Sequence, residues 1–306
     1  MKLSIIIPTY NNRQRLEMTL AYMEKQDLNK NIFEVILVND GSNDGTTEYL
    51  ESYRTNLNLT VINQINMGQA KARNNALARA EGEVVLFIDD DVLGDCDFIR
   101  NHYECHLQSQ ESNLVVVGRI KNIPFSQYIM AMHTIKNEKG ALCSSLDQFV
   151  QKDVYLNIRE HIWNSKLDYV SWLGFTTANV SLRRKSILDA GGFDENFIGW
   201  GPEDVELGYR LKSNGASFVF HSEIVNYHLD KEKAADTFYV NLNKNLRYLR
   251  EKKYPGNKEI WGYIQFIGGQ ISLEAFNALC SQDALTYTKK EEDYYFRFVD
   301  YFLRKV

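Results

Sequence analysis

The sequence predicts an α/β fold with a Rossmann-like, mostly parallel central sheet that is flanked by helices. Two observations lead to this prediction. Between Leu3 and Ile88, short continuous apolar runs alternate with segments of helical periodicity, the pattern of right-handed βαβ units that cover both faces of a sheet. In addition, 306 residues with 44% hydrophobic content can form the core of one large α/β domain, or of a domain with a small appendage.

Four strands and three helices are expected in this first part of the chain. The strands are the apolar, β-branched runs at Leu3–Ile7, Phe33–Val38, Leu59–Ile62 and Val84–Ile88. The helices between them are Arg13–Gln26, Thr46–Tyr53 and Gln69–Ala80. Each strand is followed by polar residues, and ligands of such sheets bind at the carboxyl ends of the strands. We therefore expect a polar binding region along one edge of the sheet.

The pattern is weaker in the middle of the chain and returns near the end. Leu114–Val117 reads as a strand, whereas Ile120–Lys166 has no clear periodicity and is expected to form loops and irregular helices over the site. Regular signals return at Val170–Leu182, and helices follow at about Arg184–Ala190, from Pro202 to before Gly215, and around Phe238, Leu242, Leu246 and Leu249. We predict a main domain over residues 1–230 and a helical C-terminal extension over residues 231–306 that packs on it.

Charge and cysteine usage exclude some classes of protein. The net charge is −5 and the basic residues are spread along the chain, which argues against a nucleic-acid partner. None of the four cysteines, Cys96, Cys105, Cys143 and Cys280, forms a CxxC pair, so reduced thiols are expected. No apolar run has the length of a signal peptide or a membrane span. These observations predict a cytoplasmic protein without a transmembrane segment.

The acidic triplet Asp89-Asp90-Asp91 directly follows a predicted strand. Three neighbouring carboxylates repel one another unless a cation or strong donors neutralise them, and a hard divalent ion that also holds phosphates would do so. A solvated acidic turn explains the triplet equally well when it is taken alone.

Two further segments carry residues suited to a nucleotide. The turn from Val38 to Thr46 combines glycines with short polar residues, and its Asp40 can accept a hydrogen bond from a nucleobase imide. The alternative is an ordinary turn that caps the next helix. Lys71 and Arg73 stand in the first turn of a helix, where the dipole disfavours cations, so an anion such as a diphosphate is expected nearby. Surface charges on a helix remain the alternative.

The segment Gly199-Trp200-Gly201-Pro202-Glu203-Asp204 places two carboxylates at a helix N-terminus beside an aromatic ring. The helix dipole favours the ionised carboxylate, and a positioned carboxylate is what a general base requires. The ring of Trp200 offers an apolar face to a sugar. A helix-capping acidic pair beside a core tryptophan would explain the acids, but not the flanking glycines.

Taken together, these segments resemble the family 2 glycosyltransferases of GT-A fold. The matching stretches are Ile5–Asn11, Val38–Ser42, Ala72–Asn74, Phe87–Asp91 and Gly191–Glu195, in the family order. The run Gly199–Leu211 resembles the C-terminal catalytic segment of β-galactosyltransferases, chondroitin polymerases and polypeptide N-acetylgalactosaminyltransferases. The resemblance covers roughly Lys2 to Asp230 and implies that residues 1–230 form a GT-A catalytic domain.

The resemblance also implies roles for individual residues. Those implied to bind the donor are Pro8, Tyr10, Asp40, Arg73, Asp89 and Asp90, with Asp40 facing the base. Asp91 and the late His228 are implied as metal ligands, with His221 as the competing histidine. Asp204 would be the catalytic base and Glu203 would orient the acceptor. The residues implied to contact the sugar or the acceptor are Trp172, Asn179, Trp200 and Gly201.

The implied reaction is a metal-dependent, inverting transfer from a nucleotide-sugar to a hydroxyl of a glycan, lipid-linked or natural-product acceptor. Mn²⁺ or Mg²⁺ would bridge the diphosphate. UDP is the favoured nucleotide, with dTDP and GDP open. Relatives that retain configuration carry Asn at the position of Asp204, so the acid favours inversion. A catalytically inactive binding module and a sugar nucleotidyltransferase are the alternatives, although Ile7–Asn12 lacks the basic, glycine-rich loop of the latter.

The C-terminal tail after Tyr254 is rich in aromatic residues. It places Tyr295, Phe298, Val299 and Phe302 on one helical face. Packing against the main domain would explain this face. The alternative is a docking surface for a homodimer partner or for a membrane, of which the membrane is less favoured because the tail has mixed charge.

Overall fold

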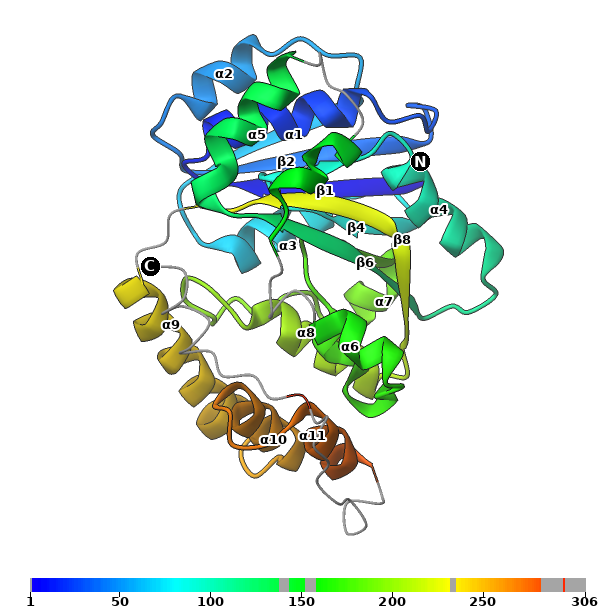
Figure 1. The fold of residues 1–306 in the computed structure, drawn as a ribbon, viewed down its shortest axis with the longest axis vertical. Coiled ribbons are helices and arrows are strands. Elements are labelled where there is room, and N and C mark those ends of the chain that lie inside the picture. The colour runs from blue at the N-terminus through cyan, green and yellow to red at the C-terminus, as the bar shows by residue number, and fades with distance from the viewer. Residues whose placement is uncertain (1, 138–142, 152–157, 232–234, 282–293, 295–306) are drawn as a thin grey trace.

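The fold was analysed in a computed structural model that describes residues 2–137, 143–151, 158–231 and 235–281, together with Tyr294. Within these residues, eight strands form a single sheet in the order β3-β2-β1-β4-β7-β6-β8-β5 (Figure 1). The strands are β1 Leu3–Thr9, β2 Phe33–Asp40, β3 Leu59–Gln64, β4 Val84–Phe87, β5 Val92–Gly94, β6 Leu114–Ile123, β7 Val180–Arg183 and β8 Ser217–Leu229.

The four strands predicted at the start of the chain form one parallel half of the sheet. β1 pairs in parallel with both β2 and β4, and β2 pairs in parallel with β3. The other half is mixed, because β7 runs antiparallel to β4 and β6, β8 is parallel to β6, and β5 is antiparallel to β8. The predicted fold class is confirmed, with β7 marking the change from the parallel to the mixed half.

Helices cover both faces of this sheet. Those of the main part are α1 Arg13–Glu24, α2 Thr46–Ser52, α3 Gln69–Arg79, α4 Phe98–Gln108, α5 Phe125–Asn137, α6 Ile158–Asn164, α7 Arg184–Asp189 and α8 Glu203–Ser213, with short 3₁₀ helices η1 Cys143–Phe149 and η2 Asp168–Gly174. Side chains alternate across β1: Ile5 and Ile7 pack with α1, whereas Ile6 packs on the opposite face with Ala72 and Ala76 of α3. Each such buried Ile or Leu contributes about 1.5–3 kcal/mol of hydrophobic stabilisation.

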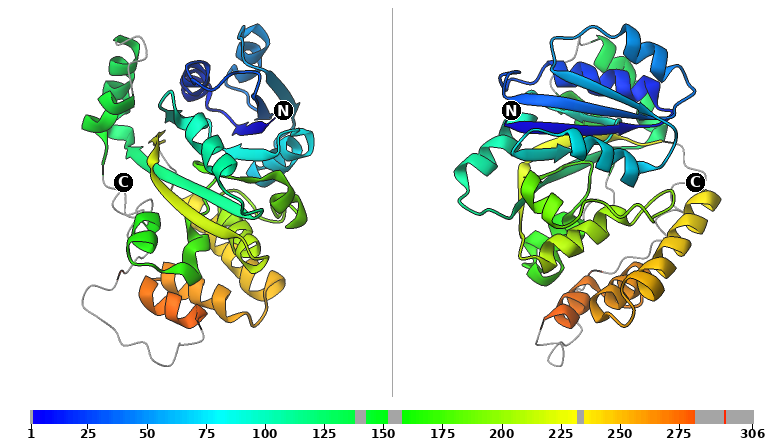
Figure 2. Two further views of the ribbon diagram at one scale, coloured as in Figure 1. Left: turned by 90° about the vertical axis from the view of Figure 1, so that its right-hand side faces the viewer. Right: turned by 180° about the vertical axis from the view of Figure 1, so that it is seen from behind.

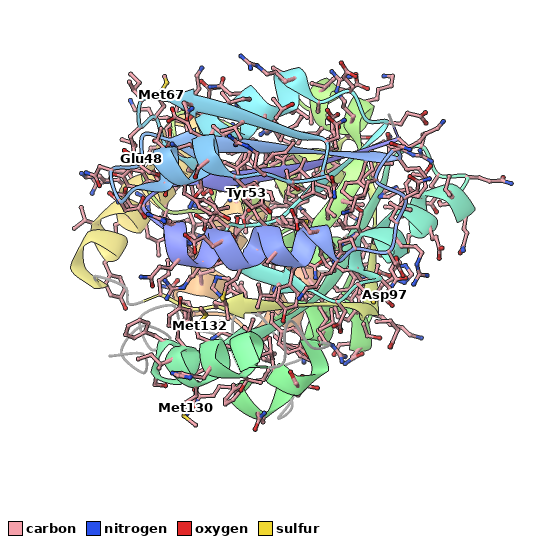
Figure 3. All side chains as sticks on the ribbon, turned by 90° about the horizontal axis from the view of Figure 1, so that it is seen from above. Glu48, Tyr53, Met67, Asp97, Met130 and Met132 are labelled. Carbon is pink, nitrogen blue, oxygen red and sulfur yellow. The ribbon has the colours of Figure 1, made fainter. Side chains whose placement is uncertain are left out.

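Two parts of the middle and late chain differ from the prediction. Ile120–Lys166 was expected to be irregular, but β6 extends to Ile123 and the 13-residue helix α5 follows it. On α5, Met130 points away from the body of the protein, whereas Met132 points inward and packs beside Tyr227 of β8 (Figure 3). The 13-residue strand β8 was not predicted, because its first half is largely exposed and its sequence lacks a continuous apolar run.

The C-terminal helices share a core with the main part. They are α9 Ala235–Tyr248, the short π-helix η3 Leu249–Lys253, α10 Lys258–Ile267 and α11 Leu273–Cys280, and they lie together at one end of the molecule (Figures 1 and 2). Leu242, Tyr263 and Phe276 pack in one apolar cluster with Trp172 and Val205. The aromatic face at Tyr295, Phe298, Val299 and Phe302 lies outside the described residues. In the described part of the chain, no helix has the length and apolar character of a membrane span.

Candidate active site

A cavity of about 510 Å³ opens at the carboxyl ends of β1, β2 and β4, beside the N-terminus of α8. It is the place where most of the residues singled out by the sequence meet. Those that line it are Pro8, Tyr10, Asp40, Arg73, Asp89, Asp90, Asp91, Trp200, Gly201, Glu203, Asp204 and His228. Segments that are far apart in the chain therefore converge on one cavity, as the strand ends predicted.

Asp40 anchors the loop that forms one wall of the cavity. Its carboxylate accepts hydrogen bonds from Gln64 Nε2 at 2.7 Å, from the Met67 amide at 2.8 Å and from the Gly68 amide at 2.9 Å. Gly68 has φ of +88°, a conformation that glycine adopts without the strain of a side chain. The carboxylate expected to face a nucleobase therefore also fixes the backbone that surrounds that position.

Lys71 lies in the first turn of α3 and Arg73, the fifth residue of the helix, lies just beyond it; both cations pair with carboxylates of the protein itself. Lys71 Nζ lies 2.7 Å from Glu195 Oε2. Arg73 is 2% exposed, and its guanidinium donates to Glu203 Oε1 at 3.0 Å and to Asp89 Oδ1 at 3.1 Å. The anion expected near these cations is thus supplied internally, because long-range folding brings the three acids to the helix. Arg73 links the acids of the β4 end to those of α8.

Asp204 and Glu203 begin α8 and face the cavity. Burial, followed by repulsion from Glu203, raises the pKa of Asp204 to about 7 and outweighs the attraction of Arg73. The Val205 amide also donates to Asp204 Oδ1 at 2.7 Å. Glu203 is 4% exposed; Oε1 accepts from Arg73, while Oε2 is buried without a hydrogen-bond partner in the described structure. Asp204 therefore has the proton affinity of a group that exchanges a proton near neutral pH.

The three carboxylates of the acidic triplet make different contacts. Asp89 pairs with Arg73, as described above. Asp90 is buried and accepts from Thr9 Oγ1 at 2.6 Å and from Asn12 Nδ2 at 2.7 Å, and burial raises its pKa to about 6. Asp90 thus ties the end of β1 to the triplet. Burial alone would raise the pKa of Asp91, but the charges of Lys231 and His228 outweigh it and lower the value.

Asp91 and His228 form the part of the site that fits a divalent ion. Asp91 Oδ1 is buried without a hydrogen bond and lies 3.5 Å from His228 Nε2. His228 Nδ1 lies 3.0 Å from Asn122 Oδ1, an acceptor, so Nδ1 carries a proton, and Nε2 is the ring nitrogen that faces Asp91. Within the described residues no group of three or more His, Cys, Asp and Glu side chains is arranged to hold a metal. Two side chains with the chemistry of metal ligands, a carboxylate and an imidazole, therefore face each other here.

Strand pairing explains why this histidine reaches the triplet. In the antiparallel pair of β5 and β8, His228 stands opposite Val92, the residue after Asp91, and the Leu229 amide donates to the Asp91 carbonyl oxygen at 2.9 Å. The competing His221 pairs with Gly118 in the β6–β8 register and does not line the cavity.

Trp172 and Asn179 do not line the cavity, contrary to the expectation that they contact the sugar. Trp172 is 1% exposed and packs against the rings of Tyr209, Tyr263 and Phe276. Asn179 is 1% exposed, and its amide nitrogen donates to the carbonyl oxygens of Arg119 and Ile224. Both side chains face the interior of the protein, and only residues 176–178 between them line the cavity.

Several residues of the cavity were missed by the sequence reading. The wall between Trp172 and Asn179 is formed by Thr176, Thr177 and Ala178. Lys231 Nζ lies 3.1 Å from Asp91 Oδ2 and 3.3 Å from Asp90 Oδ1, which places a cation among these acids. Its position three residues after His228 was the signal available for it; the threonines stand in no recognisable motif.

Family models match most of the main part of the chain. The model described as "Glycosyl transferase family 2" matches residues 4–184, and the model described as "N-terminal domain of galactosyltransferase" matches residues 159–232. The second match covers α8, His228 and Lys231. Neither reaches residues 235–281 of the C-terminal helices.

Curated relatives agree with this family. An uncharacterized glycosyltransferase of Bacillus subtilis, YfnE, is 32% identical over 82% of this chain and 70% of its own length. Validoxylamine A glucosyltransferase of Streptomyces hygroscopicus is 29% identical over 72% of this chain, and chondroitin synthase of Escherichia coli is 29% identical over 76%. The matched regions are 54% and 36% of those two relatives, so the chain spans only part of their length.

Solved structures agree with the GT-A fold. The Staphylococcus aureus TarS 1–349 fragment in complex with UDP-GlcNAc has a TM-score of 0.57 at 21% identity, over 92% of this chain and 71% of that chain. The mannosyltransferase PcManGT of Pyrobaculum calidifontis, in complex with GDP-Man and Mn²⁺, has a TM-score of 0.60 at 18% identity, over 93% and 73%. Together, the family models, the curated relatives and these structures show that this chain belongs to the family 2 glycosyltransferases.

Proposed function

We propose that this protein transfers a sugar from a nucleotide-sugar, preferably a UDP-sugar, to a hydroxyl of a saccharide or similar acceptor with inversion of configuration. The observation that carries the proposal is the arrangement of one cavity with two acidic walls. Asp89–Asp91 lie on one wall and Glu203–Asp204 on the other, with Arg73 between them. The first wall suits a diphosphate and its counter-ion, and the second suits a general base.

The nucleotide end of the donor is placed against the loops after β1, β2 and β3. Tyr10 is 48% exposed at the cavity, and Asp40 holds the neighbouring loop in position. An exposed ring and an ordered backbone are the features that a planar base needs for stacking and hydrogen bonding. Structural neighbours bound to UDP-GlcNAc and to GDP-Man support a nucleotide-sugar as the donor.

The acceptor hydroxyl is placed beside Asp204, with Trp200 and Gly201 forming the adjoining wall. Ionised Asp204 takes the hydroxyl proton as the oxygen forms its bond to the anomeric carbon. The bond from that carbon to the diphosphate oxygen breaks on the opposite face, and its electron pair leaves with the nucleotide diphosphate. A single displacement of this kind inverts the configuration of the anomeric carbon.

Asp91 Oδ1 and His228 Nε2 would hold Mn²⁺ or Mg²⁺, the ions expected from the family. Such an ion, when bound, stabilises the charge that develops on a leaving diphosphate. Asn122 keeps His228 in the tautomer that leaves Nε2 available, and Lys231 adds a positive charge on the other side of Asp91.

The proposal is tested by thermal-shift and nucleotide-release measurements with UDP-, dTDP- and GDP-sugars in the presence of Mn²⁺, Mg²⁺ or EDTA. We expect one nucleotide to stabilise the wild type in a metal-dependent way, with slow hydrolysis of one of its sugars. Asp91→Asn should lose both responses. Asp189→Asn is the control, because this carboxylate is 59% exposed and pairs only with Lys185 in the described structure.

Absence of any response in the wild type would favour the catalytically inactive binding module. Stabilisation by a nucleoside triphosphate with release of pyrophosphate would instead indicate a nucleotidyltransferase. A response that survives in Asp91→Asn would remove Asp91 from the donor site while leaving the family assignment in place.

A further inference from the structure

A single buried side chain of the C-terminal helices holds the backbone that leads into α8. Asn245 of α9 is 2% exposed. Its Oδ1 accepts from the Ile198 amide at 3.1 Å, and its Nδ2 donates to the carbonyl oxygens of Ile198 at 3.0 Å, Trp200 at 3.3 Å and Gly201 at 2.7 Å. Asn245 therefore uses both ends of its amide on one short stretch, residues 198–201.

This stretch has no helix or strand of its own to satisfy its backbone. Gly199 and Gly201 have φ of +68° and +44°, which residues with a side chain rarely adopt. A Cβ on Gly199 would lie 2.3 Å from Asn241 Nδ2, so α9 packs directly on the loop. The hydrogen bond to the Gly201 carbonyl oxygen is buried and the other three are partly buried, so the Asn245 amide supplies partners that a helix or strand would otherwise provide.

The same loop forms part of the wall of the candidate active site. Trp200 and Gly201 line the cavity immediately before Glu203 and Asp204. A shift of this loop would therefore move both the wall beside the acceptor and the start of α8.

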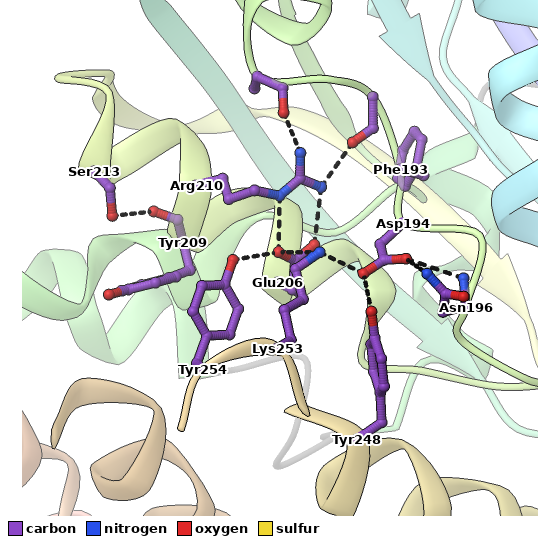
Figure 4. A network of polar contacts seen from close by, with 12 residues as sticks. Phe193, Asp194, Asn196, Glu206, Tyr209, Arg210, Ser213, Tyr248, Lys253 and Tyr254 are labelled. Carbon is purple, nitrogen blue, oxygen red and sulfur yellow. Dashed lines mark hydrogen bonds and ion pairs between the residues drawn. The ribbon is translucent and has the colours of Figure 1, made fainter. Parts of the chain in front are cut away.

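A second set of contacts fixes α8 itself to the segment that follows α9 (Figure 4). Glu206 of α8 is 1% exposed and accepts from Lys253 Nζ at 3.1 Å and from Tyr254 OH at 2.6 Å. Asp194, in the loop before α8, accepts from Tyr248 OH at 2.8 Å and pairs with Lys253. With α8 anchored in this way, the four hydrogen bonds of Asn245 hold residues 198–201 against α9.

We propose that Asn245 is a positioning residue that holds the Trp200–Gly201 wall in the geometry required for transfer, so that the C-terminal helices complete the acceptor side of the site. The proposal rests on the proposed function. It assigns a catalytic role to a helix that lies beyond the segments matched by both family models.

The decisive experiment compares hydrogen exchange and donor turnover in Asn245→Ala, Asn245→Asp and Asn243→Ala. Asn243 is an exposed asparagine on the same helix and serves as the matched control. Amides of residues 198–201 should exchange at least roughly tenfold faster in Asn245→Ala, whereas the control should match the wild type. The nucleotide-induced thermal shift should be the same in all variants, because the donor wall lies on other segments.

Measurements of kcat distinguish a positioning role of Asn245 from a role in packing alone. With the sugar donor found in the donor screen, Asn245→Ala should lower kcat roughly 10- to 100-fold with little change in the donor KM. Asn245→Asp has nearly the same shape, but it presents a carboxylate to three carbonyl oxygens. It should therefore be at least as impaired as Asn245→Ala, whereas a packing role alone would leave it close to the wild type.

Unchanged exchange at residues 198–201 in both Asn245 variants would overturn the proposal, as would faster exchange with unaltered kcat. A wild type that binds and hydrolyses no nucleotide-sugar would instead count against the proposed function. Faster exchange in the two Asn245 variants would then still establish the contact as the one that orders the loop.

Discussion

Around Arg73, charged side chains are arranged so that each depends on its neighbours. This guanidinium is buried between Asp89 and Glu203 and belongs to the same cluster as Asp204. Its two terminal nitrogens donate to these carboxylates, while Nε is buried without a hydrogen bond in the described structure. A buried carboxylate left without this cation would carry a large desolvation cost. The cluster therefore couples the stability of the protein to the state of its candidate base.

Replacing Arg73 tests this coupling. Arg73→Met should lower the free energy of unfolding by about 3–5 kcal/mol, because Asp89 and Glu203 lose their partner. Urea unfolding measures the difference. Arg79→Met on the same helix is the control, since Arg79 is exposed and the change should cost less than about 0.5 kcal/mol. Equal values for the two variants would show that the acids find other partners.

The pKa of Asp204, raised to about 7, predicts how the reaction depends on pH. A base acts only when it is ionised, so kcat/KM for transfer should rise as the pH increases from 6 to 8 and level off above that range. Asp204→Asn should reduce transfer about 10²- to 10⁴-fold while nucleotide binding persists. A rate that is constant between pH 5 and 8 would contradict the assignment of Asp204 as the base.

Between α4 and the sheet, four polar side chains form one directed chain of hydrogen bonds. Asn179 donates its amide hydrogens to carbonyl oxygens, so its Oδ1 must accept from His102 Nε2 at 2.8 Å. His102 Nδ1 then accepts from the Ser181 hydroxyl, which in turn accepts from His106 Nε2, each at 2.9 Å. Burial lowers the pKa of both histidines, so both are neutral at neutral pH, and this network binds helix α4 to strand β7.

Acid should weaken this network. Burial lowers the pKa of His102 to about 3 and of His106 to about 4 from the ordinary 6.5. The unfolded chain therefore binds more protons than the native state below pH 6.5, and each histidine removes up to about 1.4 kcal/mol per pH unit as the pH falls toward its native value. The raised pKa values of Asp90 and Asp204 act in the opposite direction.

A comparison of variants isolates the contribution of the histidines. In unfolding measurements between pH 6.5 and 4.5, His106→Gln should reduce the loss of stability on acidification by about 1 kcal/mol per pH unit relative to the wild type. His133→Gln on α5 should leave the loss unchanged, because His133 is exposed. If both variants lose as much stability on acidification as the wild type, titratable groups other than His106 cause the loss.

For the molecule as a whole, the C-terminal helices share an apolar cluster with the main part of the chain. Trp172 and Val205 are buried in an apolar cluster that also contains Leu242 of α9, Tyr263 of α10 and Phe276 of α11. Without these helices the cluster would be open to water. A protein that ends at residue 234 should therefore bind a hydrophobic dye and unfold at a temperature well below that of the full chain; an unchanged melting temperature would make the extension an independent domain.

Features that depend on neighbouring residues could be predicted from the sequence, whereas features that depend on contacts between distant segments could not. The parallel strands were predictable because both faces of β1 and β2 are buried, which leaves continuous apolar runs in the sequence. Strand β8 was not, because its first half is exposed or only partly buried and its buried residues are confined to the second half. At the site, strand ends and the family resemblance indicated most of the cavity. Trp172 was misassigned because the sequence does not tell an aromatic residue of the core from one that faces a sugar. Lys231 was missed because it reaches Asp91 through the pairing of β5 with β8, which the sequence does not show.

The contacts that join the two walls also determine when the site can exist during synthesis. Arg73 and Glu203 are separated by 130 residues, and Asn74 and Phe193 by 119. A growing chain can complete the parallel strands and the wall beside the nucleotide long before α8 and β8 leave the ribosome. A partly made chain therefore lacks Asp204, the base of the proposed mechanism, until α8 has been synthesised. On the proposed mechanism, we expect nascent chains that stop before residue 203 to lack transfer activity, because the contact of Arg73 with Glu203 that joins the two walls cannot yet form.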